Sequence, residues 1–288
     1  MHPVIFETDL FGLLSKPFSL HTYGLLIASG FLAAMMLSKR QGEREGEDPE
    51  RIVDLAFYLL LAGLVGARFV FILTKFDDYM RNPIEIFMFW RGGLVFYGGF
   101  IGAGLYMAYY CHRYRMNFFK FADILIPYLA MAHAAGRLGC IAAGCCFGKV
   151  TDVAWAIEFP VGSMAHQAHL TAGLVGVADA AHGIHPTQLY EAGAELCMFM
   201  LLISFRKYKR FHGQLFLIWL SAYPVIRSFI EMFRGDKHRG IGVFGTPLST
   251  SQFISVGVAL VAVYLYFYLR KQRVGKDDSP LESYSASA

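Results

Sequence analysis

The sequence predicts an all-α, polytopic membrane protein with seven transmembrane helices, and three observations indicate this fold. Of the 288 residues, 56% are hydrophobic and only 17% are charged, whereas soluble chains carry about 25% charged residues. Three stretches long enough to cross a bilayer contain no Asp, Glu, Lys or Arg. Four more stretches are apolar apart from one or two charges each.

In chain order, we expect the spans at 17–38, 53–73, 92–112, 121–142, 187–205, 213–233 and 240–269. The first, third and last of these are free of charge, and the last is expected to begin near Ser251, because Gly and Pro interrupt 240–247. A charged side chain at the centre of a span costs ~2.5–3.5 kcal/mol on insertion scales. The charges in the other four spans are therefore expected to face protein, water or a ligand.

Lys and Arg gather in the loops after the first, third and fifth spans and in the C-terminal tail. This bias predicts an outside N-terminus and a cytoplasmic C-terminus. The longest loop, 143–186, then forms a small extracytoplasmic subdomain within a single transmembrane catalytic domain, 1–276. The Ser- and Ala-rich end, 277–288, is expected to be a disordered cytoplasmic tail.

Composition also excludes several classes of protein. The formal net charge of +4 is spread along the chain, so no basic patch points to a nucleic-acid partner. Five cysteines in a chain of this length do not form a secreted disulfide scaffold. We find no internal repeat in the sequence, so an inverted-repeat transporter is not supported. We expect no cofactor and no metal ion.

Two arginines inside predicted spans are the first candidates for chemistry. Arg137 follows His133 by one helical turn, so both lie on one helix face; a snorkelling anchor at the interface remains an equal alternative. Tyr223, Arg227 and Glu231 also share a face, and here a buried Arg–Glu pair is the alternative. Arg234 follows closely, and because the two arginines Arg227 and Arg234 outnumber the single carboxylate of Glu231, we expect surplus positive charge that binds an anionic lipid or lipid-linked phosphate.

Other polar and small residues in the spans have simpler explanations. Arg68 is as easily structural as functional, and Tyr23 is by default an aromatic residue at the membrane interface. The glycines of 92–104 favour close helix packing. Cys140, Cys145 and Cys146 fit neither the paired spacing of a zinc site nor a Cys-x-x-Cys redox motif, so packing is the favoured interpretation.

Six motifs follow one another on the expected spans: LHTYG at 20–24, GAR at 66–68, GGLVFYGG at 92–99, GRLG at 136–139, HPTQLYE at 185–191 and YPVIRSFIEMFR at 223–234. Together and in this order they resemble the prolipoprotein diacylglyceryl transferase family of the bacterial inner membrane. The resemblance covers most of the chain. It implies an active site toward the extracytoplasmic side and seven spans with the N-terminus outside.

The implied reaction moves diacylglyceryl from phosphatidylglycerol to the lipobox cysteine of a preprolipoprotein, forms a thioether and releases glycerol phosphate. The expected partners are therefore phosphatidylglycerol, lipobox segments and the lipid bilayer. The residues expected to be catalytic are Arg137, Arg227 and Tyr97. Those expected to bind phosphatidylglycerol are Arg137, Arg227, Tyr23, Tyr223, His21, Gly98, Gly99 and Glu231.

Two departures from the family pattern leave roles open. Tyr97 stands where many members carry a His that is proposed as the general base, and a Tyr with pKa near 10 is a poor base at neutral pH. Cys140 and Cys145 stand where many members carry Asn and Glu. Two other functions stay open at this point: a transporter or binding protein for an anionic lipid, and a thiol-redox membrane enzyme.

Overall fold

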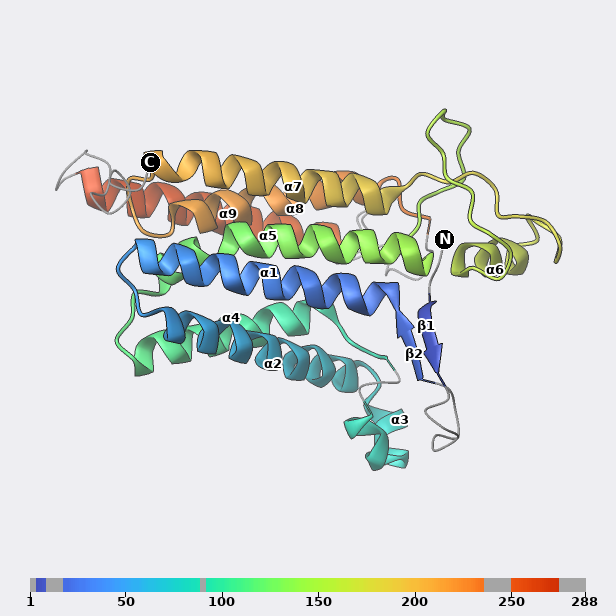
Figure 1. The fold of residues 1–288 in the computed structure, drawn as a ribbon, viewed down its shortest axis with the longest axis horizontal. Coiled ribbons are helices and arrows are strands. Elements are labelled where there is room, and N and C mark those ends of the chain that lie inside the picture. Colours follow the sequence, from blue (N-terminus) through green and yellow to red (C-terminus); the bar gives the residue numbers. More distant parts are fainter. Residues whose placement is uncertain (1–3, 9–17, 89–91, 236–249, 275–288) are drawn as a thin grey trace. The chain divides into compact units, whose positions relative to one another are not determined.

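A computed structural model describes residues 4–8, 18–88, 92–235 and 250–274 (Figure 1). The chain forms two compact units. The larger unit comprises Met1–Ala34 and Ile126–Ala288, and the smaller unit comprises Met35–Leu125. Helices α1 (Thr22–Arg44) and α5 (Phe118–Ala143) each contribute to both units.

The smaller unit is built on the helices α2 (Pro49–Thr74) and α4 (Phe96–Arg113), which pack against each other. Helix α2 begins where a capping residue and a proline predict it, because the Asp48 side chain accepts a hydrogen bond from the Glu50 N–H. Glycines let the two backbones touch: a Cβ at Gly66 would overlap the carbonyl oxygen of Gly98. The close packing expected from the glycines is thus confirmed.

A short helix α3 (Phe76–Arg81) and a 3-10 turn η2 (Pro83–Phe87) connect α2 to α4. Arg68 holds this connection through backbone carbonyls: its Nη1 donates to Gly92 O at 2.6 Å and its Nε to Ile86 O at 3.1 Å. The guanidinium is buried and saturated by such bonds. Arg68 is therefore a structural residue.

The larger unit contains α7 (Thr187–Phe205), α8 (Gln214–Glu231) and α9 (Thr250–Val274), and α8 packs against both α7 and α9 (Figure 1). A core from α5, α7 and α8 includes Ala130, Leu202, Leu215 and Trp219. Burying large apolar side chains contributes about 1.5–3 kcal/mol each when the reference is water. The core fixes which faces of α5, α7 and α8 meet.

The expected insertion after α5 is folded. It carries α6 (Met164–Thr171), which begins at Ser163, whose side chain accepts from the His166 N–H. Its own small core consists of Phe147, Phe159, Ala165, Ala181 and Ile184. A bridge between Gly148 and Arg234 ties the insertion to the end of α8.

A small antiparallel sheet pairs β1 (Val4–Thr8) with β2 (Phe18–His21). The all-α expectation is wrong for these residues, and the first span begins at Thr22 rather than at residue 17. The apolar run 18–20 continues directly into the helical run, and a short apolar segment does not by itself distinguish strand from helix. Pairing with β1 makes residues 18–21 a strand rather than the start of the helix.

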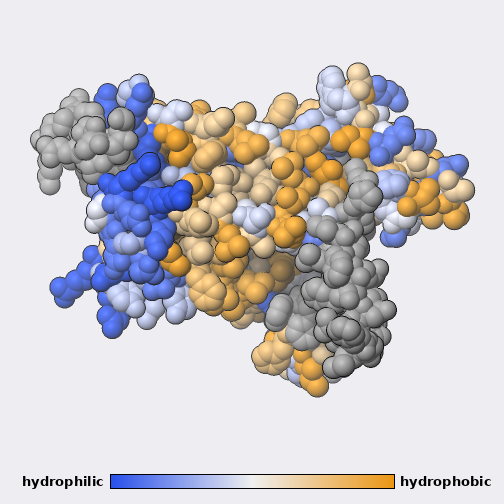
Figure 2. All heavy atoms as spheres, viewed as in Figure 1, coloured by the Kyte–Doolittle hydropathy of each residue, from blue (hydrophilic) through white to orange (hydrophobic). Residues whose placement is uncertain are grey.

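Five helices are long and apolar enough to cross a membrane, namely Thr22–Arg44, Pro49–Thr74, Phe118–Ala143, Thr187–Tyr208 and Gln252–Lys271. The other two expected spans coincide with α4 and α8, which have 18 residues each. Large apolar side chains such as Val65, Leu105 and Leu260 are exposed, and Figure 2 shows apolar residues over the visible helices. Such surfaces suit lipid, and the fold is that of a multi-pass membrane protein. The predicted tail, 277–288, lies outside the described residues.

Candidate active site

Two facing helices of the larger unit bring arginines and glutamates together. On α5, Arg137 lies one turn after His133, and its Nε donates to His133 Nε2 at 3.3 Å. Arg137 Nη2 lies 2.8 Å from Oε1 of Glu191 on α7. The Glu191 side chain is only 1% exposed, so this ion pair is enclosed by protein. The snorkelling alternative for Arg137 is not supported, because the guanidinium turns toward α7.

Glu191 links Arg137 to the second arginine. Arg227 Nη1 on α8 lies 3.9 Å from Glu191 Oε2, and the Tyr223 hydroxyl donates to Glu191 Oε1 at 3.4 Å. The predicted residues Arg137, Arg227 and Tyr223 therefore converge on one carboxylate. Two guanidiniums that converge on one anion form a geometry that also suits a phosphate.

Carboxylates from two helices compensate Arg137 and Arg227. Arg227 Nη2 pairs with Glu231 Oε2 at 2.6 Å, one turn along α8, and Arg137 pairs with Glu191. Part of this compensation comes from α7, which turns Glu191 toward both arginines. Arg227 Nη1 is nevertheless buried without a hydrogen-bond partner, and a buried donor left unsatisfied costs ~1–3 kcal/mol.

A chain of hydrogen bonds fixes His133. Its Nδ1 lies 2.8 Å from Glu195 Oε1, and Trp219 Nε1 donates to Glu195 Oε2 at 3.2 Å. Because His133 Nε2 accepts from Arg137, its Nδ1–H is the group that donates to Glu195. His133 therefore helps to orient the Arg137 guanidinium, and its Nε2 also lies 3.9 Å from Glu191 Oε1.

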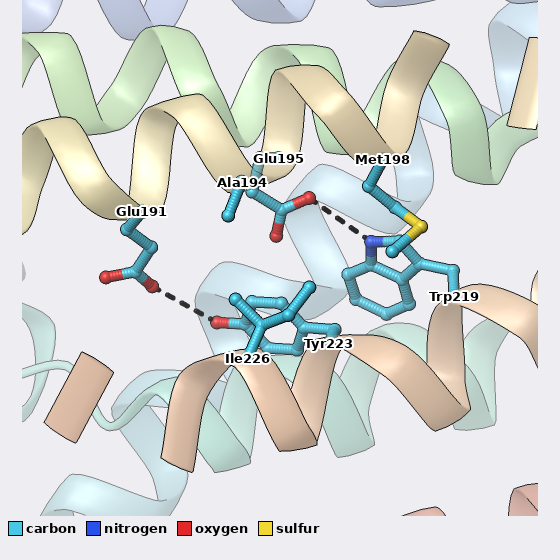
Figure 3. Close-up of a pocket in the computed structure, with 7 residues that line it drawn as sticks. All are labelled: Glu191, Ala194, Glu195, Met198, Trp219, Tyr223 and Ile226. Atoms are coloured by element: carbon cyan, nitrogen blue, oxygen red, sulfur yellow. Dashed lines mark hydrogen bonds between the residues drawn. The ribbon is translucent and has the colours of Figure 1, made fainter. Parts of the chain in front are cut away.

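A small pocket lies between α7 and α8 beside this network (Figure 3). Glu191 and Tyr223 meet at one end, and Glu195 and Trp219 meet at the other. The Tyr223 and Trp219 rings stack with centroids 4.9 Å apart. The remaining lining residues are Ala194, Met198 and Ile226. The pocket thus joins polar groups to an apolar wall.

Tyr23 reaches the same region from α1. A Cβ on Gly139 would lie 3.0 Å from Tyr23 Cδ2, so the glycine of the GRLG motif lets Tyr23 lie against α5. The Tyr23 side chain is exposed and interacts electrostatically with Arg137 and with the cysteines that follow α5. His21, the last residue of β2, is also exposed.

Those cysteines form a cluster. The Sγ atoms of Cys140, Cys145 and Cys146 all lie within 4.8 Å of one another, and all three are free thiols. Thiol hydrogen bonds to Cys140 and Cys145, together with the nearby Arg234 guanidinium, lower the pKa of the Cys146 thiol from its ordinary value, against the effect of burial. The cluster is a polar feature and not only a set of packing residues.

The other predicted site residues belong to the smaller unit. Gly98 and Gly99 pack against α2, where a Cβ on Gly99 would lie 3.1 Å from Gly63 O. Tyr97 is the second residue of α4, and its ring contacts Phe96. Their part in substrate binding stays a prediction. Sequence reasoning missed Glu191, Glu195 and Trp219, although two carboxylates four residues apart in an apolar span were a visible signal.

The fold and this cluster define a multi-pass membrane protein with buried, converging arginines. The chain belongs to the prolipoprotein diacylglyceryl transferase family, whose match covers residues 10–268.

Relatives from several bacteria are similar over most of their length, and each of the following is named phosphatidylglycerol–prolipoprotein diacylglyceryl transferase. The protein of Clostridium tetani is 29% identical over 92% of this chain and 97% of its own. That of Bordetella bronchiseptica is 32% identical over 91% and 95%, and that of Chromohalobacter salexigens is 32% identical over 93% and 94%.

Proposed function

We propose that this protein transfers the diacylglyceryl group of phosphatidylglycerol to the thiol of a lipobox cysteine in preprolipoproteins. The products are a thioether and glycerol phosphate, and the reaction is the first step of lipoprotein maturation. Family membership and the names of the relatives support the reaction. The single structural observation that carries it is the convergence of Arg137 and Arg227 on one buried anion position.

The reaction places specific demands on that position. The phosphate of phosphatidylglycerol is a diester with one negative charge, and it leaves as a monoester with nearly two. Cations aimed at the phosphate therefore bind the transition state more tightly than the ground state, which is the condition for catalysis. Arg137 and Arg227 are the groups to which we assign this stabilisation.

Glu191 holds the two arginines in position before the substrate binds. Without substrate, its carboxylate compensates both guanidiniums inside the protein. When phosphatidylglycerol enters, its phosphate accepts a hydrogen bond from Nη1 of Arg227, which otherwise lacks a hydrogen-bond partner, and shares Arg137 with Glu191. Glu231 and His133 keep the two guanidiniums in place, because each contacts the arginine of its own helix.

The remaining predicted residues bind phosphatidylglycerol in the proposal. Tyr223 and Tyr23 donate hydrogen bonds to the lipid head group, and His21 lies beside its entrance. Tyr97, Gly98 and Gly99 are also assigned to the binding of this lipid. Tyr97 then orients the lipid rather than acting as a base, because a phenol with pKa near 10 holds its proton at neutral pH.

We further propose that the chain crosses the bacterial inner membrane seven times, with the N-terminus outside. The five long apolar helices together with α4 and α8 supply seven spans. The Lys and Arg bias of the loops supports the orientation. The site then opens toward the extracytoplasmic side, where α5 ends and the folded insertion begins.

A direct test uses the full chain, purified in detergent, with phosphatidylglycerol and a lipobox peptide. We expect glycerol phosphate release and a mass gain on the peptide cysteine. A peptide with Ser in place of that cysteine is the matched control and is expected to gain no mass. Binding of phosphatidylglycerol without product would instead favour a lipid-binding protein.

A further inference from the structure

The three cysteines after α5 are arranged like ligands of a single metal ion. Their Sγ atoms lie within 4.8 Å of one another. With Zn–S bonds of about 2.3 Å, thiolates that share one zinc ion lie about 3.8 Å apart. Each sulfur therefore needs to move by no more than about 1 Å to coordinate one ion. Side-chain rotation of Cys145 and Cys146, which are only partly buried, is sufficient for this.

The backbone is held in the shape that brings the sulfurs together. Cys146 has a φ of 61°, a left-handed conformation that favours glycine. Buried side chains from the start of α7 fix the two carbonyls: Thr187 Oγ1 donates to Cys146 O at 2.9 Å, and Gln188 Nε2 donates to Cys145 O at 2.7 Å. Residues that only fill space do not require this conformation.

The ligand chemistry also favours a thiophilic cation. Each of the three cysteines offers one sulfur to the cluster. Soft thiolate ligands select thiophilic ions such as zinc. In the described part of the chain no His, Asp or Glu joins the three sulfurs, so one position of a tetrahedral ion stays open.

We propose that Cys140, Cys145 and Cys146 bind one Zn²⁺ ion as thiolates and leave its fourth coordination position to the acceptor thiol. The metal site stands on the geometry alone, whereas the role of the fourth position rests on the proposed function. This metal site differs from two expectations made from the sequence, namely that the three cysteines are packing residues and that the protein binds no metal ion.

The proposed role supplies a thiolate without needing Tyr97 as a base, for which a phenol is poorly suited at neutral pH. The acceptor thiol coordinates the ion and releases its proton to solvent. Its sulfur then attacks the glycerol carbon of phosphatidylglycerol, so that a C–S bond forms as the C–O bond to phosphate breaks. The electron pair of that bond leaves with glycerol phosphate, and no atom changes its oxidation state. The cluster and Arg137 interact electrostatically, which places nucleophile and leaving group in one region.

The metal site is tested by measuring the zinc content of the full chain, purified in detergent without chelator. We expect one zinc per chain, and none in the triple variant C140S/C145S/C146S. The matched control is C197S, since Cys197 is an exposed cysteine on α7 outside the cluster. Unchanged zinc in the triple variant, zinc-free wild-type protein that takes up no added Zn²⁺, or a disulfide within the cluster would overturn the site.

An absorption spectrum of the wild-type protein tests the metal site without requiring that the triple variant folds. Wild-type protein loaded with Co²⁺ is expected to show thiolate-to-metal charge-transfer bands. Adding a lipobox peptide is expected to change the cobalt d–d bands, whereas the Ser peptide leaves them unchanged. No charge-transfer band would contradict the metal site, and a response that is the same for both peptides would contradict the role of the fourth position.

The transfer rate separates this role from the proposed function. A free thiol with pKa about 8.5 is about 3% thiolate at pH 7, so loss of the ion is expected to slow transfer up to about 30-fold. Zinc-free protein that transfers at the full rate would refute thiol activation and leave the transferase function intact. Failure of every form to transfer, with zinc bound, would count against the transferase function alone.

Discussion

Replacing Glu191 by Gln tests whether the two arginines share one anion position. The substitution keeps the size of a side chain that is 1% exposed but removes its charge. The carboxylate lies 2.8 Å from Arg137 and 3.9 Å from Arg227. At an effective dielectric constant of about 20, these contacts are worth about 6 and about 4 kcal/mol before desolvation is subtracted. Breaking such a buried pair typically costs about 3–5 kcal/mol net.

The assay is the thermal unfolding midpoint in detergent, with and without lipid. A loss of about 3 kcal/mol lowers the midpoint by about 5 °C in a chain of 288 residues. Phosphatidylglycerol at about 100 times its Kd restores about 2.7 kcal/mol. At the same lipid concentration, we expect a larger recovery in the variant than in the wild type, because the phosphate replaces the lost carboxylate.

Two controls make the result specific. Glu158→Gln removes an exposed carboxylate from the insertion and is expected to leave the midpoint within about 1 °C. Diacylglycerol, which lacks the phosphate, is expected to give no recovery. Equal stabilisation of variant and wild type by phosphatidylglycerol would refute a shared anion position for the arginines.

Four further predictions concern single residues. Arg137→Lys keeps the charge but loses the bidentate contact, so kcat is expected to fall ~100-fold; near-normal kcat would contradict direct contact. Tyr97→Phe is expected to leave the pH profile of transfer unchanged, and a shifted profile would show that Tyr97 carries a proton. Burial, and then His182 and His166, lower the pKa of His169 below 6.5. The folded state therefore binds fewer protons than the unfolded state, so the stability is expected to fall as the pH drops through 6.5 and to level off below the lowered pKa. In His169→Gln this dependence of stability on pH is expected to disappear. Gly66→Ala is expected to lower the unfolding midpoint by overlap with the Gly98 carbonyl, unlike Gly104→Ala, where the space is open.

Much of the helical fold follows from the sequence, because length and apolarity determine which segments can cross a bilayer. Helix α9 begins at Thr250, one residue before the expected Ser251. The strand β2 was not predictable in the same way, because its apolar residues run directly into α1 and its hydrogen bonds depend on a partner earlier in the chain.

The site was only half predictable. Arg137, Arg227 and Tyr223 are recognisable from motifs, and helical spacing places Glu231 beside Arg227. The roles of Glu191 and Glu195 depend on which face α7 turns toward α5 and α8, which is a property of packing between helices. That packing brings a carboxylate to Arg137 and Arg227 that the sequence of α8 does not supply.

The cysteine cluster was likewise not predictable from the sequence, because it also depends on the folded structure. Spacing along the chain argues against a metal site, because Cys-x₄-Cys-Cys is not a paired ligand motif. The turn after α5 nevertheless folds the three sulfurs together through a left-handed Cys146. Proximity in space was set by a backbone conformation that the residue types do not reveal.

The most direct test of the account is an experimental structure of the full chain with phosphatidylglycerol bound. Phosphate oxygens are expected about 3 Å from guanidinium nitrogens of both Arg137 and Arg227, including Nη1 of Arg227, which lacks a hydrogen-bond partner without lipid. A lipid phosphate bound elsewhere, while both arginines keep only their glutamate partners, would contradict it.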